Sequence, residues 1–249
     1  MTPKRSLITR REVPTRLERL GPATNQFNEL LAWILAETEA PRRVLDVGGG
    51  GSFYDFAGLL RPHAEWMTGV DPAPSVLDRP WLDEAHAATV ERYAEGRTGA
   101  ELFDLAVCLY VVEHVDHPLE FLRAVRSLLK DGGSCFGVTP NLWHYFGMIS
   151  AAATRVGAED WLLHRVRPTE LIEAYHSPVR YRMNSVRALS ACAAAAGFTT
   201  MDVRGLEQPG MFETYFPDRL KILPKAYSSL VNRLGTARLC GTLIFRLQA

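Results

Sequence analysis

The stretch VLDVGGGGSFYDFAGLL, residues 44–60, places four consecutive glycines directly after a short apolar run that ends in an acid. Residues 42–47 have the composition of a buried strand, and residues 52–60 have the spacing of a helix. Glycine has no side chain to pack, so four of them after a strand indicate a backbone that passes close to another group. The sequence therefore predicts a ligand-binding turn between a strand and a helix.

Strand-like and helix-like segments alternate along the rest of the chain. Further apolar strands are expected at 64–71, 102–109, 134–141, 198–206 and 241–248. Residues 117–133 form a well-marked helix pattern, with Pro118 in the first turn and Gly132 at the end. This alternation predicts an α/β fold with an open, mostly parallel sheet. In such sheets ligands bind at the carboxyl ends of the strands where the strand order reverses, so the glycines and Asp71 are expected to face one crevice.

The glycine spacing decides between two kinds of nucleotide ligand. A dinucleotide-binding loop needs G-x-G-x-x-G. Here Gly48-x-Gly50 is followed at the third glycine position by Phe53, and the frame shifted by one residue reaches Tyr54. The sequence therefore disfavours NAD and FAD. Asp71 does not separate the two classes, because a carboxylate after the second strand suits the ribose hydroxyls of either ligand.

The stretch resembles motif I of the class I S-adenosylmethionine-dependent methyltransferases, [D/E]-x-G-x-G-x-[G/S], as Asp46-x-Gly48-x-Gly50-x-Ser52. In this motif Gly49 is not required. The resemblance continues over 101–141, where EHV, L-K-x-G-G and T-P-N follow in order, and is closest to the group that includes ubiquinone-type O-methyltransferases. It implies a Rossmann-like, doubly wound, seven-stranded and mostly parallel sheet with an antiparallel last strand and a helical lid insertion.

The same resemblance implies a domain organisation. Residues 1–40 would form an N-terminal arm and lid helix, and residues 41–249 the methyltransferase domain. Within that domain, 142–183 would be an insertion that covers the acceptor site.

The resemblance also implies S-adenosylmethionine as cofactor and S-adenosylhomocysteine as product. Asp46 would receive the ammonium group and Asp71 the ribose hydroxyls, while Glu91 or Tyr93 would meet the adenine amine. The expected cofactor contacts are Asp46, Gly48, Gly50, Ser52, Asp71, Glu91, Tyr93, Cys108 and Leu109.

An alcohol or phenol acceptor needs a base, and histidine titrates near neutral pH. His114 in the EHV motif is the first candidate and His144 the second, with a structural role for His114 as the alternative. Glu113, His114 and His117 also invite a metal-site interpretation, but their spacing matches no metal motif, so no divalent metal is expected.

Aromatic and basic residues follow the strand expected at 134–141. The aromatic residues would build the acceptor pocket, or else the core of the insertion. The arginines would bind a carboxylate or phosphate of the acceptor, or else lie on a solvated surface. The candidate substrate contacts are Asn141, Trp143, Tyr145, His176, Arg180 and Arg182, and His176 is also a third base candidate.

Composition limits the remaining function classes. The chain of 249 residues has a net charge of zero, which argues against nucleic-acid binding through global electrostatics. No apolar run is long enough to span a membrane, and four widely spaced cysteines suggest a reducing, cytoplasmic location. We expect methyl transfer to a small molecule in biosynthesis, onto oxygen, by a monomer or homodimer. The alternatives are N- or C-methylation and a non-catalytic scaffold with this fold.

Overall fold

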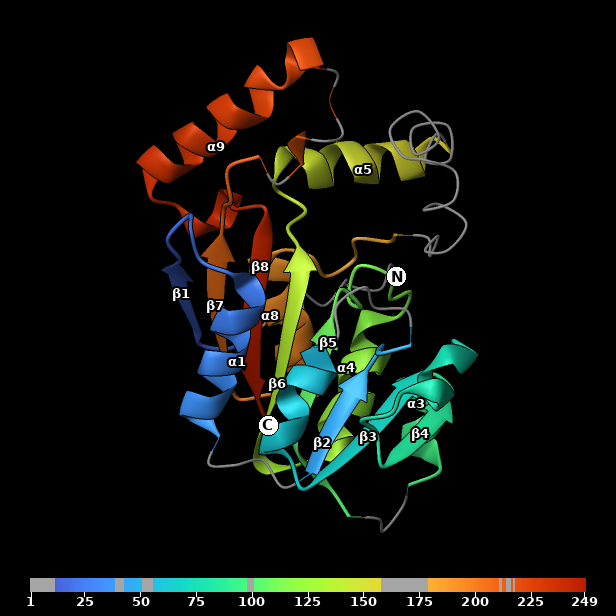
Figure 1. The fold of residues 1–249 in the computed structure, drawn as a ribbon. Coiled ribbons are helices and arrows are strands. Elements are labelled where there is room, and N and C mark those ends of the chain that lie inside the picture. The colour runs from blue at the N-terminus through green and yellow to red at the C-terminus, as the bar shows by residue number, and fades with distance from the viewer. Residues whose placement is uncertain are drawn as a thin grey trace, which may run out of the picture.

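The computed structural model describes residues 12–38, 43–50, 56–97, 101–157, 179–210, 212–213, 216 and 218–249. Within these residues, eight strands form one sheet in the order β1-β7-β8-β6-β5-β2-β3-β4 (Figure 1). Their bounds are β1 Thr15–Arg19, β2 Arg43–Val47, β3 Trp66–Asp71, β4 Glu84–Ala87, β5 Phe103–Leu109, β6 Leu129–Pro140, β7 Thr200–Leu206 and β8 Thr242–Gln248.

The sheet confirms the predicted α/β class and the antiparallel last strand. β8 runs antiparallel to both β6 and β7, and every other pair of neighbours is parallel. The predicted count of seven strands is wrong by one. β1 adds an eighth strand along β7, from Thr15 opposite Met201 to Arg19 opposite Gly205. The charged sequence TRLER does not have the pattern of a buried strand, because an edge strand can keep charges that a central strand could not bury. The sequence therefore does not predict β1.

Helices cover both faces of the sheet. Their bounds are α1 Gln26–Glu37, α2 Phe56–Leu60, α3 Val90–Glu95, α4 Pro118–Leu128, α5 Tyr145–Arg155, α8 Val186–Ala196 and α9 Ile222–Leu234. One apolar core joins α1 and α2 to one face through residues such as Leu30, Phe56 and Phe136. A second core joins α3, α4 and α8 to the other face. The chain is therefore a three-layer α/β structure.

Local signals set the ends of several helices. The Asn25 side chain accepts hydrogen bonds from the backbone N–H groups of Phe27 and Asn28, and so begins α1. Gly197, with φ 92°, ends α8 in the left-handed conformation. The helix predicted to reach residue 133 stops earlier, because Leu129 already pairs with Phe103 in the sheet.

The two segments predicted as lids differ in position. α1 packs on the sheet, with Leu30 and Ile34 fully buried and the Trp33 ring edge-on to Phe136 at 5.3 Å. α5, inside the predicted insertion 142–183, lies beyond the carboxyl end of β6 (Figure 1). Residues 158–178 of that insertion lie outside the described part of the chain. None of the described helices is long and apolar enough to cross a membrane.

Candidate functional site

The glycine loop lies where the order of the sheet reverses. β2 sits between β3 on one side and β5 on the other, so the connections that leave β2 and β5 diverge. Residues 48–50 follow β2 at this point, and Asp71 is the last residue of the neighbouring β3. The fold therefore brings together the loop and the second acid, as predicted from their positions after adjacent strands.

The backbone of the loop is held directly by Asp71. The Gly50 N–H donates a hydrogen bond to Asp71 Oδ2 at 2.9 Å, and the Ala73 N–H donates to Oδ1 at 2.6 Å. A Cβ on Gly50 would lie 2.8 Å from Asp71 Cγ, closer than carbon atoms pack. Gly50 is therefore required by this contact within the protein.

The other two described glycines of the loop are equally confined. Gly48 has φ +85°, and a Cβ there would lie 2.2 Å from Val111 Cγ2. A Cβ on Gly49 would lie 2.1 Å from Asp46 Oδ2, so this glycine, which the motif does not require, lies against the acid that precedes it. Asp46 is itself buried. Ser52, the last residue of the predicted motif, lies outside the described residues.

A second layer of contacts fixes the carbonyl of the same loop. The Gly50 carbonyl accepts hydrogen bonds from Ser75 Oγ at 2.5 Å and from the Arg79 guanidinium at 2.9 Å. The Arg79 guanidinium also lies 5.5 Å from the centre of the Trp81 ring. The turn is therefore ordered at both its N–H and its carbonyl by the segment after β3.

The two candidates for adenine recognition lie on α3, which follows β4. Glu91 is in the first turn, near the carboxyl end of β4. Tyr93 is buried instead, and its ring contacts His86 at 4.8 Å. Burial and the negative charge of Glu84 raise the pKa of Tyr93 to about 12. Glu84, whose charge acts on Tyr93, pairs in register with Thr68 of β3.

The carboxyl end of β5 carries two predicted contacts and one that was not predicted. The Cys108 thiol lies in the core 3.9 Å from Cys135 Sγ, and this contact with burial raises its pKa. Leu109 ends the strand half-buried. Tyr110 follows with φ 56°, and its hydroxyl donates to Gln26 Oε1 at 3.0 Å. No sequence signal marks this strained tyrosine, because positive φ is rare outside glycine.

The EHV motif forms the turn after β5. The His114 N–H donates to the Val111 carbonyl at 2.9 Å, and the His114 side chain is half-buried. Glu113 is buried and accepts a hydrogen bond from Thr139 Oγ1 at 3.1 Å. Thr139 in turn accepts one from Asn184 Nδ2 at 2.5 Å. Burial raises the pKa of Glu113 to about 8. The sequence predicts Glu113 only as a metal-ligand candidate, and no local signal marks its link through Thr139 of β6 to Asn184, which lies just before α8.

Acidic, histidine and cysteine side chains do not gather into a metal site in the described part of the chain. No group of three or more of them could hold an ion there. His117 begins α4 as its N-cap residue, without a side-chain capping bond.

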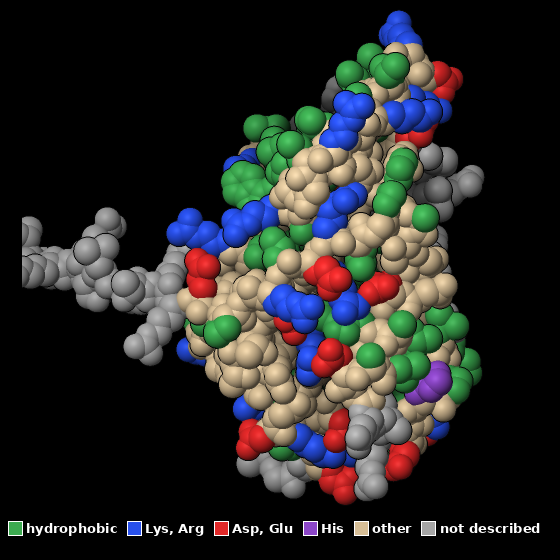
Figure 2. Space-filling model, turned by 90° about the vertical axis from the view of Figure 1, so that its left-hand side faces the viewer, with side chains coloured by type: hydrophobic (Ala, Val, Ile, Leu, Met, Phe, Trp, Pro, Cys, Tyr) green, Lys and Arg blue, Asp and Glu red, His purple; other side chains and the backbone are tan. Residues whose placement is uncertain are grey.

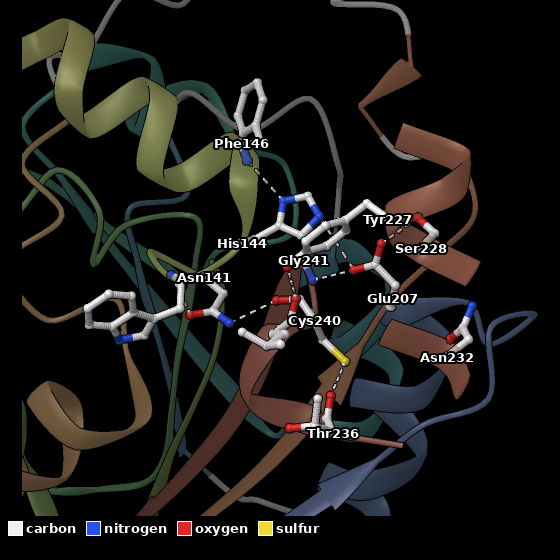
Figure 3. A network of polar contacts seen from close by, with 12 residues as sticks. Asn141, His144, Phe146, Glu207, Tyr227, Ser228, Asn232, Thr236, Cys240 and Gly241 are labelled. Atoms are coloured by element: carbon white, nitrogen blue, oxygen red, sulfur yellow. Dashed lines mark hydrogen bonds and ion pairs between the residues drawn. The ribbon is translucent and has the colours of Figure 1, made fainter. Parts of the chain in front are cut away.

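His144, the second base candidate, is part of a buried polar network (Figure 3). Its Nδ1 accepts a hydrogen bond from the Phe146 N–H at 3.3 Å, which begins α5, and its Nε2 lies 3.5 Å from Glu207 Oε2. Glu207 also accepts from the Gly241 N–H at 2.7 Å and from Ser228 Oγ at 2.5 Å. Both ring nitrogens of His144 therefore face protein groups. The network joins the start of α5 to β7, α9 and β8.

Aromatic rings enclose this histidine. Tyr145, Phe212 and Tyr227 have ring centres at 4.2, 5.1 and 4.8 Å from that of His144. Burial and the charge of Glu207 raise the pKa values of Tyr145 and Tyr227 to about 12. Tyr145, a predicted substrate contact, is therefore placed within an aromatic cluster around His144.

Asn141 and Trp143, also predicted as substrate contacts, have contrasting surroundings. Asn141 is buried, and its Nδ2 donates to the carbonyls of Arg238 and Cys240 at 2.8 and 2.9 Å (Figure 3). Its Oδ1 accepts from the Trp143 N–H at 3.1 Å. Trp143 itself is 55% exposed. The amide of Asn141 is thus committed to holding β6 to the segment before β8, whereas the Trp143 ring is open to solvent.

The two described arginine candidates converge on one acid. Arg180 Nε lies 2.9 Å from Asp116 Oδ1, and the Arg182 guanidinium donates to the Asp116 carbonyl at 2.8 Å. The Arg180 N–H also donates to the Glu113 carbonyl at 2.6 Å. These contacts close residues 179–182 onto the turn after β5. His176 lies outside the described residues.

Both the sequence and the fold of the chain are similar to those of known proteins. A family model described as a methyltransferase domain matches residues 15–203. A ubiquinone biosynthesis O-methyltransferase of Bordetella avium is 31% identical over 195 residues, which cover 74% of this chain and 74% of that protein. The protein of the same name from Xanthomonas campestris pv. campestris (strain B100) is 35% identical over 120 residues, covering 45% of this chain and 48% of that protein. The chain thus spans about half the length of several curated relatives that it matches.

Solved structures share the architecture at low sequence identity. A SAM-dependent methyltransferase from Archaeoglobus fulgidus has a TM-score of 0.56 and 15% identity, covering 90% of this chain and 95% of that one. An S-adenosylmethionine-dependent methyltransferase from Mesorhizobium loti has a TM-score of 0.53 and 16% identity, covering 92% and 100%. At these identities the likeness establishes the fold.

Proposed function

Because the chain belongs to the methyltransferase-domain family, and is an S-adenosylmethionine-dependent methyltransferase, we propose that it methylates an oxygen atom of a small molecule. The observation that carries this proposal is the meeting of the glycine loop with Asp71 at the switch point of the sheet. The relatives named as O-methyltransferases support oxygen as the atom that is methylated.

The residues present fit this cofactor. A side chain at any of the three described glycines would overlap Asp46, Asp71 or Val111, so the loop keeps its backbone uncovered beside two carboxylates. In our proposal Asp46 receives the ammonium group, and Asp71 accepts the ribose hydroxyls while its hydrogen bond to Gly50 fixes the loop. Glu91 is the better placed of the two adenine candidates, because Tyr93 is turned into the core.

The cofactor, when bound, supplies a methyl group on a sulfonium sulfur that is already an excellent leaving group. The protein's own task is therefore to align the acceptor, exclude water and remove one proton. We assign proton removal to an imidazole nitrogen of His114. His144 is buried within the network around Glu207, whereas His114 is half-buried in the turn after β5, and this position favours His114 as the base.

The acceptor side of the site rests on the residues after β6 and on the closing segment 179–182. Trp143 has an exposed ring suited to a flat acceptor, in keeping with its predicted role. Arg180 and Arg182 are held by Asp116, so in our proposal they position the closing segment and meet an anionic acceptor group only with their remaining donors. The four cysteines are free thiols, which supports a cytoplasmic location.

Incubation with S-adenosylmethionine carrying a deuterated methyl group, and with a panel of catechols, phenols, amines and activated carbon acids, tests this proposal. We expect labelled methyl groups on oxygen, read out by mass spectrometry and NMR. Labelling of nitrogen or carbon alone would contradict O-methylation.

The base assignment has its own test in the same assay. His114→Ala should lower kcat about 100-fold while leaving the affinity for S-adenosylhomocysteine within about twofold. His117→Ala, in the same turn, is the matched control and should change neither quantity. Equal losses of turnover and cofactor affinity in His114→Ala would make His114 a structural residue.

A further inference from the structure

α9 has an apolar side that the described part of the chain leaves exposed. Its buried residues Pro224, Ser228 and Val231 face the body of the protein. On another side Ile222, Leu223, Leu230 and Leu234 are exposed by 71, 55, 54 and 60%. Leu223, Leu230 and Leu234 are spaced by seven and four residues, and Ile222 directly precedes Leu223, so the four lie along one side of the helix. We call these four residues the α9 stripe. A solvent-facing helix surface normally carries polar residues at such positions.

Positive charge gathers on and around the same helix. Between residues 218 and 238 the chain carries five cations and a single acid, although the whole chain has a net charge of zero. The cations are Arg219, Lys221, Lys225, Arg233 and Arg238, and the acid is Asp218. Asp218 pairs with Lys221, and Glu213 pairs with Lys225. For Arg219, Arg233 and Arg238, no acid among the described residues lies within ion-pair distance.

A groove runs along the flank of α9 beside the stripe. It encloses about 430 Å³ and is lined by Pro209, Lys225, Ser228, Ser229, Asn232 and Arg233. Lys225 and Arg233, eight residues apart on α9, both line this groove and are exposed. Figure 2 shows hydrophobic side chains interspersed with Lys and Arg over the upper part of this face of the molecule, where α9 lies. An apolar stripe bordered by cations and hydroxyl groups is the pattern of a helix that lies in a lipid–water interface.

We propose that α9 docks on an anionic lipid bilayer, with the α9 stripe among the acyl chains and Lys225 and Arg233 against headgroup phosphates. The charge of the surface selects this partner over a second copy of the chain. A twofold contact would set the same cationic surface against itself, whereas an anionic bilayer attracts it. α9 connects the carboxyl end of β7 to the start of β8, so it lies at the sheet edge that carries the glycine loop. Docking would hold that edge close to the membrane surface.

Vesicle flotation with the 249-residue chain tests this surface. We expect the wild type to bind vesicles of phosphatidylcholine with 30% phosphatidylglycerol at least tenfold more strongly than vesicles of phosphatidylcholine alone, with binding that weakens as salt is added. The double variant I222S/L230S should lose at least tenfold in partitioning, and K225Q/R233Q should lose the preference for anionic vesicles. The matched control is Leu77→Ser, since Leu77 is also 55% exposed but lies on the turn after β3.

All variants change exposed residues, so their melting temperatures should match that of the wild type. Vesicle binding that is absent in the wild type, or unchanged in I222S/L230S, would overturn the proposal. Unchanged binding in I222S/L230S would point instead to other basic residues, such as Lys4, Arg5, Arg10 and Arg11. A dimer in analytical ultracentrifugation that I222S/L230S abolishes, without vesicle binding, would assign the α9 stripe to a second copy instead. S-adenosylhomocysteine binding in solution, measured in parallel, separates this outcome from any failure of the proposed activity.

Discussion

The imidazole of His144 faces the carboxylate of Glu207 across 3.5 Å, and each side chain is only 2% exposed. His144 begins α5, beyond the carboxyl edge of the sheet, and Glu207 follows β7 and accepts a hydrogen bond from Ser228 of α9. The pair therefore connects these three elements. Because the hydrogen bonds to Glu207 come from Ser228 and the Gly241 backbone as well, the carboxylate is the centre of this network rather than one member of a simple pair.

Glu207→Gln should therefore be strongly destabilising. The substitution removes the negative charge that His144, Ser228 and the Gly241 N–H face, and the Gln amide group matches these buried donors poorly. We expect a cost of about 3 kcal/mol in the free energy of unfolding. Glu213→Gln is the matched control, because Glu213 pairs with an exposed lysine and should cost under about 1 kcal/mol. Urea denaturation measures both. Similar small losses would mean that Glu207 contributes little to holding α5.

Glu113 should make stability depend on pH. Its pKa is about 8 in the folded protein and near 4.5 when exposed, so the unfolded chain releases its proton first. The contribution of this group to stability is complete below pH 4.5 and is lost as pH rises towards 8.

Glu113→Gln removes that titration while keeping an oxygen acceptor for Thr139. Relative to the wild type, the variant should gain about 1 to 3 kcal/mol in the free energy of unfolding between pH 5.5 and pH 8. Urea denaturation of both proteins at pH 5.5 and pH 8 measures this change. The other titrating groups are the same in wild type and variant, so their contributions cancel in the comparison. A wild-type-to-variant difference that is the same at both pH values would contradict a buried, protonated Glu113.

Gly48→Ala should be worse than an ordinary substitution at positive φ. Gly132 has a similar φ of +80° but nothing within 4 Å of an added Cβ, so Gly132→Ala should cost only the backbone strain, about 1 to 2 kcal/mol. Gly48→Ala adds the overlap with Val111, about 1 to 3 kcal/mol more, and should also weaken binding of S-adenosylhomocysteine. Val111→Ala in the Gly48→Ala background should restore part of both losses. Equal costs for the two glycine variants would show that the Val111 contact does not matter.

Asn141 and Trp143 should separate stability from acceptor recognition. Asn141→Ala leaves the carbonyls of Arg238 and Cys240 without their donor, at a cost of about 2 kcal/mol in the free energy of unfolding. Trp143→Ala changes an exposed side chain, so it should cost under about 0.5 kcal/mol but raise KM for the acceptor severalfold. An unchanged KM in Trp143→Ala would remove Trp143 from the acceptor site.

The sheet and the loop could be predicted because their signals are local. Phe53 at the third glycine position distinguishes the motif from a dinucleotide loop, and Asp71 ends a strand adjacent to β2, so both reach the same edge. The contacts that depend on distant segments could not be predicted in this way. Nothing near His144 in the sequence points to Glu207, and nothing near Glu113 points to Asn184.

Tertiary packing decides several features that the local sequence pattern does not show. The short charged strand β1 has the composition of a basic arm, but its backbone pairs with β7. The local pattern does not distinguish Glu91 from Tyr93, whereas packing buries Tyr93 on the core side of α3. α9 was not predicted at all, since its outer apolar stripe obscures the usual division between a buried and a polar face.

Calorimetric titration with S-adenosylhomocysteine tests the central claim most directly, namely that the glycine loop and Asp71 bind the cofactor. We expect micromolar binding by the wild type, a loss of at least tenfold in affinity in Asp71→Asn, and no change in Asp78→Asn, an exposed acid on the turn after β3. Asparagine keeps an oxygen acceptor for the loop, so circular dichroism should confirm that both variants fold. Binding by Asp71→Asn as tight as that of the wild type, or no binding by the wild type at high micromolar ligand, would contradict the account.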